Sequence, residues 1–230
     1  MSRLIVIPAR LQSSRLPGKV LLPLLGRPML WHVWQRALCS EAEVLIAAAD
    51  EQIADVAHHF GAQVVLTDPD LPSGTDRVAA ALWERDGDHV INLQADEPLV
   101  EVSTLLRLFE ALEDPSVAVC TPAAPMFEDP GPSVVKVVVD AMGDALYFSR
   151  AAIPHGGPYL RHVGLYGYQR EALLDFVGRS VGALERTESL EQLRLLEQGC
   201  RIRVCQVSSA PPSVDTAEDL ALVRELLEAQ

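Results

Sequence analysis

Three basic side chains gather in one short loop near the start of the sequence. Arg10, Arg15 and Lys19 follow the apolar run of residues 3–9, and Pro17-Gly18 prevents a regular helix there. A loop that leaves the carboxyl end of a strand in an α/β sheet can surround phosphates with its cations and its backbone N–H groups. The loop matches neither G-x-G-x-x-G nor G-x-x-x-x-G-K-[ST], so on these residues alone phosphate binding and an ordinary surface loop stay equally open.

Two aspartates have the chemistry to hold a hard cation. Asp96 closes the run HVINLQAD of residues 89–96, and its carboxylate should emerge at the same sheet edge as the basic loop. Asp215 lies in SVDTAEDL, where Thr216 and Asp219 have the spacing of a helix capping box. Each aspartate alone is better explained by a turn or a cap. Only the two together predict a magnesium site.

The segment SGTDR, residues 73–77, lies between a predicted strand and a predicted helix. Small residues at such a place let a ligand approach the backbone closely. Capping of the helix by Ser73 or Thr75 is the simpler explanation of the same residues.

A strictly alternating run at residues 161–170, RHVGLYGYQR, predicts a strand with His162 and Tyr166 on one face. A buried, hydrogen-bonded histidine is the alternative to a catalytic one. The predicted helix at 189–198 adds polar groups that face either a ligand or water: Glu188, Glu191 and Gln192.

Apolar runs of strand length alternate with segments of helical period along most of the chain. The predicted strands lie at residues 3–9, 43–50, 62–67, 89–96 and 117–124. Helices are predicted in MLWHVWQRAL after Pro28, and where Val102, Leu105, Leu106, Phe109 and Leu112 form an apolar stripe. This alternation predicts an α/β fold with a mostly parallel sheet and helices on both faces.

The pattern changes after about residue 125. VVKVVVD and ALYFSR flank a glycine-bearing turn and predict a β-hairpin. The α/β pattern then returns with the helix at 189–198, the strand CRIRVCQV and a helix at 216–228. We therefore expect residues 1–124 and 200–230 to form a core, with residues 125–199 as a subdomain inserted in one continuous domain.

Composition and charge restrict the class of protein. The chain has 230 residues, 49% of them apolar, without an apolar run of about 18 residues or a signal segment, so we expect a soluble cytoplasmic protein that does not enter the membrane. The four cysteines should be reduced core thiols. A net charge of -13 argues against nucleic-acid binding, although the first 40 residues contain six basic and no acidic residues.

Taken in order, these segments resemble the 3-deoxy-D-manno-octulosonate (Kdo) cytidylyltransferases, or CMP-Kdo synthetases, over essentially the whole chain. The series is IPAR, SRLPGK, SGTDR, NLQADEP, VKVVVD, ALYFSRAAIP, LRHVGLYGY, LEQLR and VDTAEDL. Each motif is weak alone, but the series in family order is specific. The resemblance implies a Rossmann-like nucleotidyltransferase fold with an inserted sugar-binding and dimerisation subdomain, a homodimer, and a Mg²⁺-dependent reaction of CTP with Kdo that gives CMP-Kdo and pyrophosphate for lipopolysaccharide biosynthesis.

The resemblance also implies roles for individual residues. The nucleotide contacts would be Pro8, Arg10, Arg15, Lys19, Ser73, Gly74, Arg77 and Gln94. The magnesium ligands would be Asp96 and Asp215, which form the expected catalytic set together with Lys19. The sugar-acid contacts would be Gln94, Arg150, His162, Tyr166, Glu191 and Gln192.

The sequence departs from the family pattern at two places and leaves the sugar acid open. Ala95 stands where the family usually has glycine, and the span AAIPHGGPYL between YFSR and RHVG is shorter than in many relatives. An 8-amino-3,8-dideoxyoctulosonate or an N-acylneuraminate is the alternative substrate. A non-catalytic CTP sensor is the alternative from another class, and a generic flavodoxin-like module would leave the basic loop unexplained.

Overall fold

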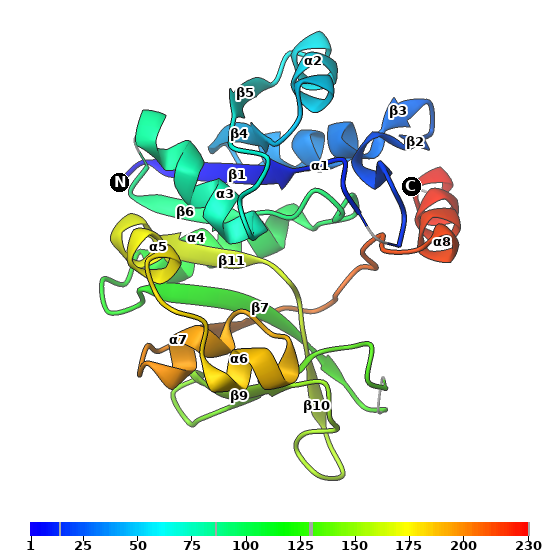
Figure 1. Cartoon of the computed structure of the whole chain (residues 1–230). Coiled ribbons are helices and arrows are strands. Elements are labelled where there is room, and N and C mark those ends of the chain that lie inside the picture. Colours follow the sequence, from blue (N-terminus) through cyan, green and yellow to red (C-terminus); the bar gives the residue numbers. More distant parts are fainter. Residues whose placement is uncertain (14, 86, 129–130, 230) are drawn as a thin grey trace. The chain divides into compact units, whose positions relative to one another are not determined.

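The computed structural model describes residues 1–13, 15–85, 87–128 and 131–229, and the chain divides into two compact units (Figure 1). The first unit is Met1–Leu106 with Pro211–Gln230, and the second is Arg107–Ala210. The division falls earlier in the chain than the predicted boundary after residue 124, and later than the one before residue 200. The strands at residues 119–126 and 203–206 lie at these boundaries. They pair with each other, and the first also pairs with another strand of the second unit.

Four parallel strands form the sheet of the first unit. They are β1 (Arg3–Ala9), β4 (Glu43–Ala48), β5 (Gln63–Leu66) and β6 (His89–Asn92), in the order β5-β4-β1-β6. Near-continuous apolar runs such as Leu4 to Ile7 are fully buried, as in sheets covered on both faces. The strand predicted at 89–96 ends at Asn92, so Asp96 lies in the segment beyond the strand.

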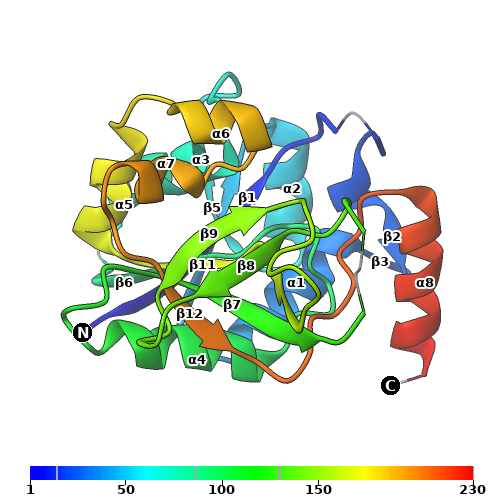
Figure 2. The same cartoon turned by 90° about the horizontal axis from the view of Figure 1, so that it is seen from below.

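Helices cover both faces of this sheet, as predicted. The helices are α1 (Met29–Leu38), α2 (Glu51–His59), α3 (Gly74–Ala81) and the first half of α4 (Val102–Leu112). Two 3₁₀ turns, η1 (Lys19–Leu21) and η2 (Leu82–Glu84), and the short hairpin of β2 (Pro23–Leu24) and β3 (Arg27–Pro28) complete the connections. Figures 1 and 2 show α1 and α3 on opposite faces of the sheet.

The C-terminal segment returns to the first unit through an apolar cluster. Val214 and Val223 pack with Leu24, Met29 and Leu99, and all five are buried. Helix α8 (Ala217–Glu228) begins after the N-cap residue Thr216, whose capping box with Asp219 is confirmed. The residue between Val214 and Thr216, Asp215, is therefore held on both sides.

The second unit contains a mixed set of strands. They are β7 (Val119–Met126), β8 (Lys136–Val139), β9 (Ala145–Ser149), β10 (Tyr159–His162), β11 (Tyr166–Gln169) and β12 (Arg203–Gln206). β12 pairs parallel to β7, whereas β10 and β11 pair antiparallel to it. The predicted hairpin is confirmed as β8 and β9, and Gly143 in its turn has a φ of +83° that favours glycine.

The single strand predicted at 161–170 is wrong. Residues 159–162 pair with 126–123, and residues 167–168 pair with 120–119, so residues 163–166 lie opposite residues 121–122 alone. This bulge splits the strand into β10 and β11. The bulge adds two residues relative to β7. Because this number is even, the predicted alternation of side chains between the two faces of the strand continues in β10 and in β11.

The helix predicted at 189–198 is shorter in the structure, where only residues 193–197 of that range are helical. Helix α6 (Ala183–Glu188) ends where Ser189 enters the left-handed region with a φ of +54°, and α7 (Leu193–Glu197) begins after Gln192. Helix α5 (Arg170–Val177) precedes both. Within the described residues, no helix combines the length and the apolar character needed to cross a membrane.

Candidate active site

A pocket of about 280 Å³ in the first unit gathers every residue predicted to bind the nucleotide or the metal. These residues are Pro8, Arg10, Arg15, Lys19, Ser73, Gly74, Arg77, Gln94, Asp96 and Asp215. They come from the loop after β1, the start of α3, the segment after β6 and the segment before α8. The fold thus brings together side chains that lie far apart in the sequence.

A glycine in the left-handed region shapes the basic loop. Gly18 has a φ of +67°, and its N–H donates to the carbonyl oxygen of Leu11 at 3.0 Å, which closes the loop. The N–H of Leu11 donates to Oδ2 of Asp50 at 2.9 Å, which anchors the loop to the segment after β4. Lys19 follows Gly18 directly in η1, and Ser14 lies outside the described residues.

The ammonium of Lys19 lies between two carboxylates. Its Nζ donates to Asp96 Oδ2 at 2.5 Å, to Asp215 Oδ1 at 3.0 Å and to the carbonyl oxygen of Val214 at 3.0 Å. Burial disfavours its charge, but the attraction of Asp96 and Asp215 outweighs burial, so the pKa of Lys19 is raised. Arg15 Nη2 adds an ion pair to Asp215 Oδ2 at 3.0 Å.

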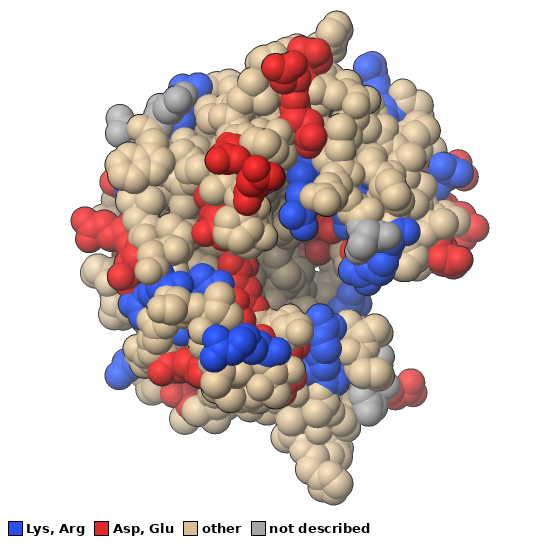
Figure 3. Space-filling model, in the orientation of Figure 1, with Lys and Arg blue, Asp and Glu red and all other residues tan. Residues whose placement is uncertain are grey.

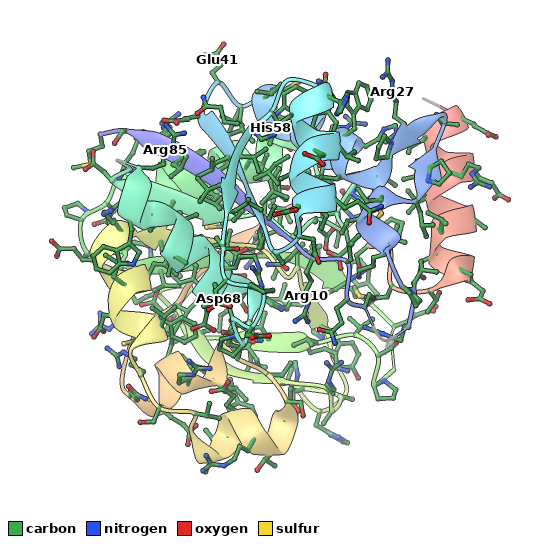
Figure 4. All side chains as sticks on the ribbon, turned by 45° about the horizontal axis from the view of Figure 1, so that its top comes forward. Arg10, Arg27, Glu41, His58, Asp68 and Arg85 are labelled. Carbon is green, nitrogen blue, oxygen red and sulfur yellow. The ribbon has the colours of Figure 1, made fainter. Side chains whose placement is uncertain are left out.

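Arg77 supports the loop after β5 as well as lining the pocket. It is only 2% exposed, and its Nη1 donates to the hydroxyl of Thr67 and to the carbonyl oxygen of Asp68. Burial and the positive charge of Arg10 lower the pKa of Arg77. Arg10 and Asp68, both labelled in Figure 4, lie on the segments that follow β1 and β5, and each lies near enough to Arg77 to affect its pKa.

The start of α3 lies close against its neighbours. Ser73 Oγ accepts from the N–H of Asp76 at 3.1 Å, so the expected helix cap is confirmed. A Cβ added at Gly74 would lie 3.4 Å from Gln94 Oε1 and 3.5 Å from Pro8 Cγ. The helix therefore begins on the pocket wall, where the positive end of its dipole favours an anion.

In the second unit, His162 lies among uncharged neighbours. Its ring centroid is 5.0 Å from that of Phe148 and 5.5 Å from that of Tyr166, and its Nε2 is 2.9 Å from Oγ1 of Thr121. Burial lowers the pKa of His162 to about 3, so the imidazole is neutral at physiological pH. A neutral His162 cannot form an ion pair with a carboxylate.

Two buried polar atoms of the second unit lack a hydrogen-bond partner among the described residues. They are Oη of Tyr166 and Nε2 of Gln192. Leaving such a group unpaired costs about 1–3 kcal/mol, so native proteins rarely do so without a reason such as ligand binding. Burial and the nearby Tyr168 and Glu191 raise the pKa of Tyr166, so its phenol stays protonated and can donate.

Arg150 is held by its main chain at the end of β9. Its backbone N–H donates to Oε2 of Glu188 at 3.4 Å, and the hydroxyl of Ser149 donates to Oε1 of the same carboxylate at 2.9 Å. Glu188 therefore fastens α6 to β9 and does not simply face water. No contact among the described residues joins Arg150 to His162 or Tyr166, so these predicted sugar-acid residues are not brought together by direct contact.

Comparison with known proteins identifies the family. Residues 4–202 match the family model described as Cytidylyltransferase. The 3-deoxy-manno-octulosonate cytidylyltransferase of Rhodospirillum rubrum is 46% identical over 97% of this chain and 95% of its own length. The protein of the same name from Thioalkalivibrio sulfidiphilus is 48% identical over 100% of both chains. The chain belongs to the 3-deoxy-manno-octulosonate cytidylyltransferase family.

A solved structure from this family has the same fold. It is described as CMP:2-keto-3-deoxy-manno-octonic acid synthetase complexed with CTP, and it is 40% identical to this chain. The TM-score is 0.95, over 100% of this chain and 99% of that one. The predicted Rossmann-like α/β nucleotidyltransferase fold is therefore confirmed, and the chain is a nucleotidyltransferase.

Sequence reasoning missed polar residues in the pocket of the first unit and beside His162 in the second unit of this cytidylyltransferase. Gln12 and Ser13 line the pocket of the first unit, in a loop where only Arg10, Arg15 and Lys19 were predicted to bind a ligand. Thr121 contacts His162, yet it lies in a run that predicts only an apolar strand. A hydroxyl in the middle of a buried strand is the one signal in the sequence that points to it.

Surface charge is consistent with a small anionic ligand. On the face drawn in Figure 3, basic side chains form small groups among acidic ones. No broad basic surface covers that face within the described part of the chain. Positive charge is instead concentrated in the pocket of the first unit, at Arg10, Arg15, Lys19 and Arg77.

Proposed function

We propose that this cytidylyltransferase joins CMP from CTP to the anomeric hydroxyl of Kdo and releases pyrophosphate, as a step of lipopolysaccharide biosynthesis. The observation that carries the proposal is similarity along the whole chain to relatives named for this reaction. The pocket of the first unit supports the nucleotide part of the proposal. The polar cluster of the second unit, which consists of His162, Tyr166, Glu191 and Gln192, supports the sugar-acid part.

The triphosphate of CTP suits the basic pocket. Arg10, Arg15 and Lys19 offer three cations within one loop, and the N-terminus of α3 adds backbone donors beside Gly74. The nucleotide and the sugar acid are both anions, so bringing them together requires their charge to be neutralised. These side chains do so in a partly enclosed site, where electrostatic attraction is stronger than in water.

Magnesium suits the donor set of Asp96 and Asp215. Hard cations prefer carboxylate oxygens, and the ammonium of Lys19 already lies where oxygens of both carboxylates meet within 3.0 Å. The described residues contain no cluster of three or more His, Cys, Asp or Glu side chains for a metal, so substrate oxygens and water would complete the coordination. When bound, magnesium would lower the pKa of the attacking hydroxyl and offset phosphate charge.

The sugar acid suits the polar cluster of the second unit. Tyr166 and Gln192 have buried polar atoms ready to pair with a ligand, and Glu191 lies close enough to raise the pKa of Tyr166. Arg150 supplies the cation for the carboxylate of the sugar acid. Its main chain is fixed by Glu188, and its exposed guanidinium makes a hydrogen bond to the carbonyl oxygen of Ser133 at 3.3 Å, which a ligand carboxylate can replace.

The chemistry that follows is an in-line attack by the sugar hydroxyl on the α-phosphorus. The bond to pyrophosphate breaks as the new bond forms and the hydroxyl gives up its proton to solvent water, so no covalent enzyme intermediate is required. Lys19 and Arg15 stabilise the negative charge that develops on the leaving pyrophosphate. Positioning of the two substrates supplies much of the rate, as in other phosphoryl transfers.

The test is magnesium-dependent pyrophosphate release from CTP, measured in parallel with Kdo, 8-amino-3,8-dideoxyoctulosonate and an N-acylneuraminate. Product masses identify the nucleotide sugar in each reaction. Release with Kdo and a CMP-Kdo mass support the proposal. Release with a different sugar acid alone would reassign the substrate, and CTP binding without release in any reaction would favour a nucleotide sensor.

We also propose a homodimer that works in the cytoplasm, where CTP is synthesised. Phe127, Met142 and Leu146 of the second unit are large apolar residues that are 61% to 88% exposed in the single chain. These three residues are candidates for the contact between the two copies. Light scattering tests the dimer, and a mass near 25.1 kDa would contradict it.

A further inference from the structure

The bulge between β10 and β11 surrounds one buried hydroxyl. Residues 163–166 lie opposite residues 121–122 of β7, and Thr121 is fully buried at that point. Its Oγ1 lies 2.7 Å from the carbonyl oxygen of Leu165 and 2.9 Å from Nε2 of His162. Bulges beside functional sites often redirect side chains, and here the hydroxyl links the bulge to the histidine.

A threonine hydroxyl has one proton to donate, so the direction of each hydrogen bond can be assigned. Two oxygens 2.7 Å apart repel unless a proton lies between them, and the carbonyl of Leu165 has none. Thr121 therefore donates to Leu165, while the carbonyl oxygen of Val163, at 3.4 Å, is a weaker competitor. Toward His162 the hydroxyl can only accept, so the proton between them belongs to Nε2.

We infer that Thr121 is a positioning residue that fixes His162 as the Nε2–H tautomer, with the Nδ1 lone pair free to accept a hydrogen bond from a hydroxyl group of the sugar acid. The rings of Phe148 and Tyr166 on either side of the imidazole restrict its rotation. The identity of the ligand rests on the proposed function, whereas the tautomer rests only on the contacts of Thr121.

The assignment gives the cluster a defined pattern of donors and acceptors. A lone pair at Nδ1 repels a carboxylate and accepts a hydrogen bond from a hydroxyl. His162 therefore binds a hydroxyl group of the sugar acid and not its carboxylate. Gln192 Nε2 is a donor, and Tyr166 Oη can donate or accept, so these two atoms complement acceptor oxygens. A polyhydroxylated sugar acid offers both kinds of partner. The acid group itself is left to Arg150.

The test compares Thr121→Val, which keeps the shape but removes the hydroxyl, with Thr121→Ser, which keeps the hydroxyl. Two-bond ¹H–¹⁵N correlation spectra of ¹⁵N-histidine-labelled protein report the tautomer, and the spectrum of His162→Gln identifies the His162 signal. We expect the Nε2–H pattern in the wild type and in Thr121→Ser. In Thr121→Val we expect a mixture of tautomers, because the acceptor is gone.

Kinetics provide the second readout. In Thr121→Val the KM for the sugar acid should rise roughly 3- to 10-fold, the effect of one hydrogen bond, while the KM for CTP stays unchanged. In Thr121→Ser the KM for the sugar acid should stay near the wild-type value. An Nδ1–H tautomer in the wild type, or an unchanged His162 pattern in Thr121→Val, would overturn the inference. The expected spectra without turnover of any sugar acid would leave the tautomer established and reject the proposed function instead.

Discussion

Lys19 Nζ lies 2.5 Å from Asp96 Oδ2, although 77 positions separate the two residues in the chain. The parallel pairing of β1 with β6 explains this, because the segments that follow both strands leave the same edge of the sheet. Asp215 reaches the same ammonium from the C-terminal segment, which the packing of Val214 holds in place. The charges of the three side chains therefore act together.

Replacing either carboxylate beside Lys19 should abolish activity and leave the fold intact. Asp96→Asn and Asp215→Asn keep the side-chain shape but remove the charge that would bind magnesium, so we expect turnover to fall on the order of 10²-fold or more. Pyrophosphate release measures the loss, and circular dichroism with thermal unfolding checks the fold. Near-normal turnover in both variants would rule out the metal assignment.

Replacing Lys19 should strengthen metal binding while it weakens catalysis. In Lys19→Met the two carboxylates lose the ammonium that faces them, so we expect Mn²⁺ without nucleotide to bind at least about tenfold more tightly. Electron paramagnetic resonance of free Mn²⁺ gives the affinity. Arg107→Met, which removes an exposed cation of α4, is the matched control and should leave the affinity unchanged. Equal or weaker Mn²⁺ binding in Lys19→Met would show that the ammonium does not compete for this position.

Local patterns in the sequence predicted the elements that carry the first site. The apolar run of β1, the helix α4 and the capping residues Ser73 and Thr216 depend on neighbours close in the chain, and the structure has all of them. Leu106 of the predicted stripe of α4 is 43% exposed and does not belong to the buried face. The order of motifs then supplied the grouping of Lys19 with the two carboxylates, which no local pattern contains.

The features that were mispredicted depend on partners far away in the chain. The bulge in the strand at 161–170 is hydrogen-bonded to Thr121 of β7, which lies at least 42 positions earlier in the chain, so the residues of the segment alone do not predict it. Ser189 adopts a left-handed conformation that is uncommon for serine, so the helix predicted to start at residue 189 begins only at Leu193.

A methyl group at Gly167 should destabilise the second unit. The added Cβ would lie 2.7 Å from Cys120 Sγ, which is too close for a contact, and 3.2 Å from Leu112 Cδ1, which would have to move slightly. We expect Gly167→Ala to lower the free energy of unfolding by about 1–3 kcal/mol, measured in urea. Adding Cys120→Ala removes the sulfur and should restore part of the loss. Strictly additive effects of the two substitutions would show that the sulfur is not the obstacle.

Stability should depend on pH through His162. Burial lowers the pKa of His162 to about 3, while an unfolded histidine titrates near 6.5, so between these values the unfolded state alone binds the proton. The folded state should therefore lose stability as pH falls below about 6.5, by about 1.4 kcal/mol per pH unit for this one group, and gain none above it. His162→Gln lacks this proton, so the stability that the wild type has over the variant near pH 7.5 should shrink by about 2 kcal/mol near pH 5 in urea unfolding. Carboxylates titrate equally in both proteins and cancel in the comparison. A difference between the two proteins that does not change with pH would mean that His162 is not held neutral by burial.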